Sequence, residues 1–574
     1  MIYNDKYPSI DAEMSDCQMG GRKRKGCRNN IFIVNGIIQD VMSSKKKKPV
    51  SLQIYDYKQM FDAINLEEAV SDIYNAGVND DNLILIYKAN KEVKMAVNTP
   101  NGLSERQSIK NVVLQGDTFG SILASVQVDS IGKDVMETDY GYRYKDTLTI
   151  GMLGLVDDMI GVTDAGYKAQ QMNAILNVKT AEKRLQFGIT KCKSMLVSKN
   201  GPTVPHNDMM VDSWKVRHVD NPTTGINELV ETYEGLEVIK KTDKQKYLGF
   251  ILSSRGDNMA NINEMKNKSI WIKRKIFSKL RDLNLQKYYF ECAIIFLNVM
   301  LRSSILYGCE TYYNLKETEI RQLERIEESF LRKMFGTNKG CPITQLYLES
   351  GHVPARFEIK KTRLLFLQYI LQENPDSQIC KFLKLQIEKP TRGDWASSCQ
   401  KDLKDFKIEI SFDEIRTLTK NQFCKILKTS IKQTAFEYLI GKQKSKGQEI
   451  KYSELKMSEY LMPNMENLSI DDRRKIFETR NRMIPIPMNF PNNKNKNDTR
   501  CWCGEIEDTK HIYLCKYWTE QSEQYSFEMI YTDNMPKLVK VYKRFKESYK
   551  KREEYKTEIE NPHAIPLSDP LLSV

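Results

Sequence analysis

The chain has 574 residues, which is too long for one hydrophobic core, so we expect roughly two to four domains. Hydrophobic residues make up 40% and charged residues 28%, as is ordinary for a globular protein. The net charge of +13 favours a polyanionic partner, nucleic acid first and an anionic membrane second.

Two segments argue against secretion and membrane insertion. The opening residues, MIYNDKYPSIDAEM, are polar and form no signal peptide. The longest apolar stretch, residues 292–301, is about half the length of a membrane span, so we expect a buried helix there and no membrane partner. The twelve cysteines follow no disulfide framework, which indicates a reducing compartment.

The first part of the chain alternates helices and strands. Apolar spacing predicts a helix over residues 31–41, with Asn30 as its cap. Residues 50–55 alternate in polarity and predict a strand with one apolar face, which Asp56 closes. The segment NLEEAVSDIYNAG predicts the next helix, ending at Gly77.

The segment LTIGMLGLVDDMIGVTD is apolar on both sides of Asp157 and Asp158. It predicts two short strands joined by a tight turn at the aspartates. A polar helix at about 165–186 follows, and the segments CKSMLVS and KYLGFILSS predict further strands. Up to about Ser254 the pattern is therefore that of an α+β layer.

The remainder of the chain is predominantly helical. Helices are expected from Ile262 to about Glu388, and a second, Lys-rich helical region extends to about Met483. Residues 484–500 are rich in Pro and Asn and predict a linker. A short Cys/His cluster and a charged helical tail follow it.

Asp56 and the Asp157–Asp158 turn place acids at strand ends. If these acids converge, they form an oxygen-rich site suited to Mg²⁺. Two such ions can activate a primer 3′-hydroxyl and stabilise a leaving pyrophosphate. The alternative is a hairpin that uses Asp-Asp only as turn-forming residues.

Several segments, taken in chain order, resemble the palm motifs of a reverse transcriptase: YDYKQMFDAI, LQGDTFGSIL, GLVDDM, FGITKCKSM and YLGFILSSRG. More narrowly, they resemble those of non-long-terminal-repeat retrotransposons, over about residues 18–258. The resemblance implies a right-hand polymerase with a palm and fingers built on an antiparallel sheet with helices. It also implies an RNA-directed DNA polymerase that uses two Mg²⁺ ions, an RNA template and a DNA primer.

The resemblance gives the acids and one lysine their roles. Asp56 matches the first metal-binding aspartate, Asp157 the ligand shared with it, and Asp158 its neighbour. Lys191 aligns best, and Lys193 next, with a lysine that protonates the leaving pyrophosphate or holds the triphosphate, the alternative being a solvated lysine.

Substrate contacts follow from the same resemblance. Phe61 matches the aromatic gate that excludes a 2′-hydroxyl, and Gln115 and Gly116 resemble the segment that cradles the nucleotide and the template base. Leu248 and Gly249 mark the hairpin that positions the primer end. The alternatives are core packing for Phe61, an ordinary loop for Gln115 and Gly116, and an edge hairpin.

Residues 18–30, QMGGRKRKGCRNN, resemble a fingers segment. Arg22 and Lys23, with the basic residues that follow them, are expected to contact template phosphates. A nuclear import signal and a solvated loop are the alternatives.

The segment CWCGEIEDTKHIYLC supplies Cys501, Cys503, His511 and Cys515, which together suit a four-coordinate Zn²⁺. It also resembles the CCHC zinc knuckle downstream of the polymerase in some retrotransposons. The alternative is a small core of reduced cysteines. The segment RNRMIPIPMNF just upstream, with Arg480 and Arg482, is expected to contact nucleic acid.

The predicted domains are an incomplete fingers and palm over 1–255, a helical thumb over 256–345, a helical linker region over 346–495, the zinc knuckle over 496–520 and a charged helical tail over 521–574. The resemblance suggests a retrotransposon reading frame truncated at both ends, with a possible chromosomal DNA target and nuclear residence. The alternatives are an inactive or domesticated nucleic-acid-binding remnant of such an enzyme and a protein-interaction scaffold on the same fold.

Overall fold

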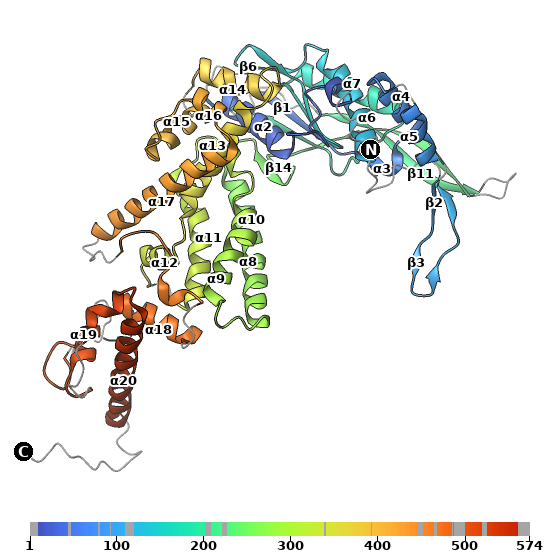
Figure 1. The fold of residues 1–574 in the computed structure, drawn as a ribbon. Helices are drawn as coiled ribbons and strands as arrows, with labels where there is room; N and C mark the ends of the chain where they lie inside the picture. Colours follow the sequence, from blue (N-terminus) through green and yellow to red (C-terminus); the bar gives the residue numbers. More distant parts are fainter. Residues whose placement is uncertain are drawn as a thin grey trace, which may run out of the picture. The chain divides into compact units, whose positions relative to one another are not determined.

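The computed structural model describes residues 10–43, 48–78, 81–91, 93–109, 120–200, 208–220, 227–337, 340–391, 393–445, 452–463, 468–484, 486, 500–518 and 525–560. The chain forms two compact units (Figure 1). The first comprises residues 1–265, 306–320 and 359–427, and the second residues 266–305, 321–358 and 428–574. The functional domain limits given above remain predictions.

The first unit contains a central sheet, several β-hairpins and covering helices. Its elements are α2 (Cys27–Ser43), β1 (Val50–Tyr55), α3 (Met60–Ala63), α4 (Leu66–Asn75), α5 (Asp81–Lys91), β2 (Val93–Met95), β3 (Asn98–Thr99), β4 (Gly102–Leu103), β5 (Gln107–Ile109), α6 (Gly120–Met136), β6 (Tyr142–Tyr144), β7 (Leu148–Ile150), β8 (Met152–Leu155), β9 (Asp158–Asp164), α7 (Tyr167–Glu182), β10 (Lys193–Val197), β11 (Met210–Asp220), β12 (Asn227–Val238), β13 (Lys240–Lys241), β14 (Lys244–Tyr247), β15 (Phe250–Ser253), η2 (Cys309–Thr311), α14 (Gln378–Glu388), α15 (Trp395–Asp405) and α16 (Phe412–Thr417).

The central sheet has the strand order β13-β10-β1-β9-β8. The pairs β10–β1, β1–β9 and β9–β8 are antiparallel, whereas β13 joins β10 in parallel. The strand predicted over 50–55 and the hairpin predicted at the paired aspartates are both confirmed, the latter as β8 and β9. The mixture of α-helices and sheet agrees with the predicted α+β class.

Strand β1 is buried along its whole length, so its polar face is covered as well as its apolar face. Gln53 and Tyr55 point to α7, where the Gln53 amide donates to the carbonyl of Ala169 at 2.9 Å and the Tyr55 hydroxyl bonds Asn173 at 2.7 Å. Because helices cover the strand, its polar side chains are satisfied inside the protein rather than by water.

Helix α2 packs against strands β8 and β10. The helix predicted over 31–41 is confirmed, but it begins at Cys27, so Asn30 is a buried interior residue and not the cap. Phe32 of this helix contacts the rings of Phe366, Phe382 and Trp395 edge to face at 4.9–5.6 Å. Residues that lie far apart in the sequence thereby join the core beside the sheet.

Four helices have residues in both units: α8 (Met259–Asp282), α11 (Glu317–Phe335), α13 (Ala355–Leu371) and α17 (Lys420–Lys444). The second unit also contains α9 (Tyr289–Phe296), the π-helix η1 (Leu297–Arg302), α10 (Ser303–Ile305), α12 (Ile343–Ser350), η3 (Glu459–Leu461), α18 (Ile470–Arg480), α19 (Thr509–Leu514), η5 (Phe527–Tyr531) and α20 (Met535–Glu560). The predicted helical character of this region and of the charged tail is confirmed.

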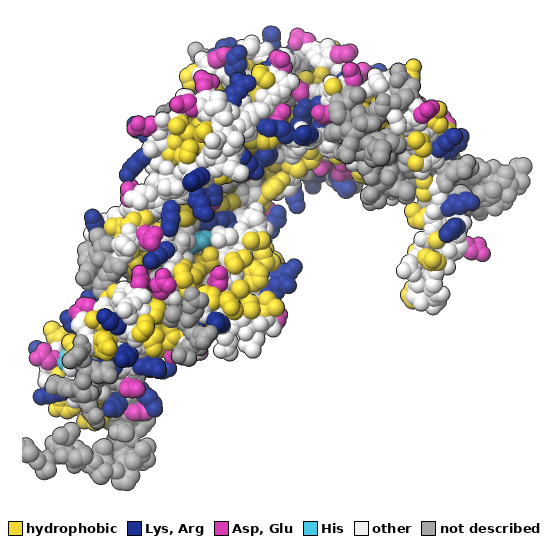
Figure 2. Space-filling view, in the orientation of Figure 1, with side chains coloured by type: hydrophobic (Ala, Val, Ile, Leu, Met, Phe, Trp, Pro, Cys, Tyr) yellow, Lys and Arg dark blue, Asp and Glu magenta, His cyan; other side chains and the backbone are white. Residues whose placement is uncertain are grey.

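The apolar stretch 292–301 is only partly buried, which corrects the prediction of a buried helix. Leu297 and Leu301 are buried, but Ile295 is 50% and Val299 65% exposed. Figure 2 shows hydrophobic side chains gathered over α8 and α9. Among the described residues, no helix is both long and apolar enough to cross a bilayer.

Candidate active site and candidate metal centre

The sheet register brings the predicted catalytic acids to one end of neighbouring strands. Tyr55, the last residue of β1, pairs with Met159 of β9. Continuing this antiparallel register by one residue sets Asp56 opposite Asp158. The pair Leu155↔Asp158 closes the β8–β9 hairpin, so Asp157 lies in its two-residue turn.

The electrostatic coupling of the three carboxyl groups agrees with this geometry. Burial raises the pKa of Asp157, and the negative charge of Asp56 raises it further. Burial, followed by the charges of Asp157 and Asp56, raises the pKa of Asp158 to about 6. Since neighbouring carboxylates disfavour ionisation of Asp157 and Asp158, a bound cation would stabilise their ionised forms.

Lys191 is the cation beside Asp56, with its Nζ atom 3.1 Å from Oδ2. Its side chain is 70% exposed, and its hydrogen bond to Asp56 is the main cause of its raised pKa. The ammonium group therefore lies where a positive charge is favourable, yet it can leave without breaking the core.

Gly188, in the segment FGITK that also contains Lys191, contacts Asp56 through its main chain. Its amide donates to the carbonyl of Asp56 at 2.7 Å. A Cβ atom at Gly188 would lie 2.9 Å from Oδ2 of Asp56, so this position accommodates only glycine without a shift of the carboxylate. The lysine of this motif was predicted from the sequence, whereas the role of its glycine was not.

Oxygen atoms from Asp56, Asp157 and Asp158 are donors of the type that Mg²⁺ prefers. In the described ranges, only a Cys/His group has three or more candidate ligand atoms all within 4.8 Å of one another. The three aspartates therefore form a more open set than that group, and they share their surroundings with Lys191.

The predicted substrate contacts have different outcomes. Phe61, in α3, is partly buried and packs against the core cluster that contains Tyr55 and Tyr57. Gln115 and Gly116 lie outside the described residues.

Leu248 and Gly249 form the turn between β14 and β15, which confirms the predicted hairpin. Both have positive φ, 48° and 79°, as a two-residue type I′ turn requires. The hydroxyl of Tyr307 donates to the carbonyl of Leu248 at 2.8 Å and so braces this turn.

The charge of Arg22 is paired and buried in this structure, contrary to the expectation that it contacts template phosphates. It is only 8% exposed, and its guanidinium pairs with Asp11 and donates to the carbonyls of Ser15 and Gln18. Its partners are therefore internal. Lys23, the next residue, is exposed.

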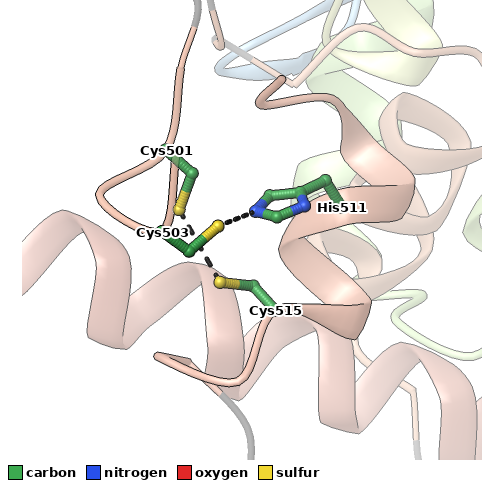
Figure 3. Close-up of side chains that lie close together, drawn as sticks. All are labelled: Cys501, Cys503, His511 and Cys515. Carbon is green, nitrogen blue, oxygen red and sulfur yellow. Dashed lines mark hydrogen bonds between the residues drawn. The ribbon is translucent and has the colours of Figure 1, made fainter. Parts of the chain in front are cut away.

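Cys501, Cys503, His511 and Cys515 lie together, with their candidate ligand atoms all within 4.8 Å of one another (Figure 3). The Sγ atoms of Cys501 and Cys515 are 3.6 Å apart, and Cys503 Sγ is 3.3 Å from His511 Nε2. Tetrahedral Zn²⁺ with Zn–S bonds of about 2.3 Å separates two sulfurs by about 3.8 Å. The four side chains therefore fit a zinc ion with small adjustments.

Local hydrogen bonds hold the main chain at His511 and Cys515 without the help of a metal ion. Asp508 caps α19 by accepting from the amide of His511 at 2.6 Å, and the Cys515 amide donates to the carbonyl of His511 at 2.7 Å. Burial raises the pKa of Cys515 to about 12 and also raises that of Cys501. These thiols consequently stay protonated at neutral pH unless a cation stabilises the thiolates.

Arg480, expected to contact nucleic acid, is instead a buried structural residue. Its Nε atom is 2.9 Å from Oε1 of Glu349, which is itself fully buried, and its Nη1 donates to the carbonyl of Ile530 at 3.0 Å. As with Arg22, an acid inside the protein pairs with the cation, and here that acid is 131 residues away.

The part of the chain that contains the three aspartates matches a known protein family. Residues 3–252 match the family model described as "Reverse transcriptase (RNA-dependent DNA polymerase)". This segment is similar to reverse transcriptases. It makes up less than half of the chain. No curated protein sequence matches the chain.

Solved structures of telomerases also show similarity. The match to apo telomerase from Candida tropicalis covers 75% of this chain and 61% of the telomerase chain, at 12% identity and a TM-score of 0.32. The match to telomerase from Candida albicans, in complex with a TWJ fragment of telomeric RNA, covers 72% of this chain and 55% of the telomerase chain, at 12% identity and a TM-score of 0.30. The chain spans less than two thirds of each of these structures.

Proposed function

We propose that the chain is an RNA-directed DNA polymerase that extends a primer 3′-hydroxyl with deoxynucleotides by two-metal-ion nucleotidyl transfer. The observation that carries this proposal is the placement of Asp56 at the end of β1 opposite the turn that holds Asp157 and Asp158. These residues lie within the segment that matches the reverse transcriptase family.

In this proposal Asp56, Asp157 and Asp158 hold two Mg²⁺ ions. When bound, the ions would supply activation of the primer hydroxyl and stabilisation of the leaving pyrophosphate. The raised pKa values of Asp157 and Asp158 fit this role, since a carboxylate set that repels itself gains from a divalent cation.

Other side chains orient the substrates. Lys191 exchanges its pairing with Asp56 for the triphosphate and donates a proton to the leaving pyrophosphate. Phe61 packs under the sugar and excludes a 2′-hydroxyl, and the braced turn of Leu248 and Gly249 supports the primer end. Gln115 and Gly116 contact the incoming nucleotide, and Lys23 contacts a template phosphate.

The proposal also covers the type of retrotransposon from which the polymerase comes. The order of the motifs and the Cys/His cluster downstream of them support a polymerase of the non-long-terminal-repeat retrotransposon type. We assign Zn²⁺ to Cys501, Cys503, His511 and Cys515 as a knuckle. Chromosomal DNA as the target and a nuclear location belong to the same proposal.

Primer extension on an RNA template tests the polymerase. The purified full chain should extend a DNA primer in the presence of Mg²⁺ and lose this activity with EDTA. Asp157→Asn should lower extension at least about a thousandfold, because it removes a metal ligand whose charge acts on the reacting groups. Asp164→Asn, at the opposite end of β9, is the matched control and should leave extension within about twofold of the parent.

Absence of extension by the parent chain would refute the proposal. If that chain still bound the RNA template at low salt, the result would support the alternative of a non-catalytic nucleic-acid-binding protein. Failure to bind RNA and DNA as well would leave a scaffold.

A further inference from the structure

The turn that carries Asp157 has an unusual backbone. Val156, its first residue, has φ of 59°, in the left-handed region. A β-branched residue rarely adopts this conformation, because its side chain clashes with the backbone there. Such a residue persists only where the surrounding structure holds it, and residues of this kind are found preferentially at functional sites.

Gln18 provides that hold through both ends of its side-chain amide. Its Oε1 atom accepts from the amide of Val156 at 2.8 Å, and its Nε2 atom donates to the carbonyl of Val156 at 3.0 Å. Gln18 is 1% exposed, so water does not compete for these bonds. Both polar backbone groups of the strained residue are therefore satisfied by one side chain 138 positions away.

The main chain around Gln18 continues the contact. The Gly154 amide donates to the carbonyl of Cys17 at 2.6 Å, and the Met19 amide donates to the carbonyl of Gly154 at 2.8 Å. The Gly20 amide also donates to Oε1 of Gln18 at 2.8 Å. A Cβ atom at Gly20 would lie 2.4 Å from the amide nitrogen of Val156, so the close approach needs glycine.

We propose that residues 17–20 act as a clasp, with Gln18 as a positioning residue that holds the β8–β9 turn in the conformation that sets Asp157 and Asp158 beside Asp56. This inference rests on the proposed polymerase function for its effect on catalysis. A glutamine is suited to the task because its amide offers a donor and an acceptor at once. The chemistry of segment 18–30 is thus divided, with Gln18 turned inward to the turn and Lys23 outward to solvent.

Activity measurements with the full chain test the positioning role. Gln18→Ala should lower kcat of Mg²⁺-dependent primer extension at least about tenfold, because two buried hydrogen bonds to one residue are lost. The Kd for the primer–template should stay within about twofold. Val156→Gly added to Gln18→Ala should restore part of the lost kcat, since glycine adopts a positive φ without the clasp.

Hydrogen exchange provides a measurement that does not depend on activity. Exchange of the amides in the peptide covering 152–162 should accelerate at least about tenfold in Gln18→Ala, since the Val156 amide loses its acceptor. The matched control is Gln368→Ala. Gln368 is also buried and donates to the main-chain carbonyls of Ile415 and Leu418, far from the aspartates in sequence.

The control should lower the temperature of thermal unfolding while leaving both kcat and exchange in 152–162 unchanged. Unchanged exchange in Gln18→Ala would overturn the clasp, as would a loss of kcat no greater than that of Gln368→Ala. If Gln18→Ala does not fold, Gln18→Met keeps the length of the side chain while removing both the acceptor and the donor, and the same criteria apply. If the parent chain extends no primer, the polymerase proposal fails while the exchange experiment still decides whether the clasp exists.

Discussion

Substitution of Gly188 by alanine is the sharpest test of the geometry around Asp56. The new Cβ atom would lie 2.9 Å from Oδ2 of Asp56, whereas ordinary contacts of a Cβ begin near 3.4 Å. The carboxylate must therefore retreat by about 0.5 Å or rotate. The backbone at Gly188 lies outside the left-handed region, so alanine is tolerated there without backbone strain.

The expected effect is large for catalysis and small for stability. A displacement of about 1 Å at reacting groups can cost about a hundredfold in rate, so half of it should cost roughly tenfold in kcat/KM. For folding, removal of glycine from the unfolded chain gains about 0.4–1 kcal/mol. This gain offsets the lower end of the overpacking cost of about 1–3 kcal/mol, since the obstacle is a partly exposed side chain. The net change in the free energy of unfolding should be within about 1 kcal/mol.

Primer extension under single-turnover conditions and urea unfolding measure the two quantities. Gly441→Ala is the control, because its Cβ would meet no atom within 4 Å and the residue lies inside α17. It should stabilise the chain slightly and leave extension unchanged. A kcat/KM for Gly188→Ala within about twofold of the parent would refute the argument that Gly188 positions the carboxylate of Asp56.

Four further outcomes are expected. Because the pKa of Asp158 is raised to about 6, the folded chain takes up a proton as pH falls from about 6 toward 4, so extension at subsaturating Mg²⁺ should decline below about pH 6. Because ionised Asp158 destabilises the folded chain, Asp158→Asn should stabilise the metal-free chain above pH 6, by no more than about 1 kcal/mol once its solvent exposure is taken into account. Near pH 3, where the carboxyl group is protonated, thermal unfolding should show no difference from the parent. Elemental analysis should find one Zn²⁺ per parent chain and none in Cys515→Ser, while Cys424→Ser keeps the metal; retention by Cys515→Ser would contradict the zinc assignment. Glu349→Gln leaves its buried arginine partner uncompensated and should cost about 3–5 kcal/mol in urea unfolding, against less than about 1 kcal/mol for Glu454→Gln in an exposed pair; equal costs would contradict the internal role of that arginine.

Local patterns in the sequence determined most of the secondary structure of the central sheet. The apolar and β-branched segments around Asp157 and Asp158 predicted the β8–β9 hairpin, whereas the turn at Leu248 and Gly249 was expected only from the resemblance to reverse transcriptases. Turn chemistry and side-chain period act over a few residues, so a single sequence contains the information needed. The spacing of Cys501, Cys503, His511 and Cys515 likewise sufficed to group the four ligands.

Only the tertiary structure decided which polar residues turn inward. Arg22 and Arg480 have the composition of nucleic-acid contacts, but internal partners hold them, and for Arg480 that partner is 131 residues away. Gln18 was noticed only as the first residue of the fingers-like segment 18–30, and its contact was not predicted, because that contact depends on a turn 138 residues downstream. Burial and hydrogen-bond pairing across such separations depend on how the elements pack, since the free energy of a polar side chain is set by the neighbours that replace its water.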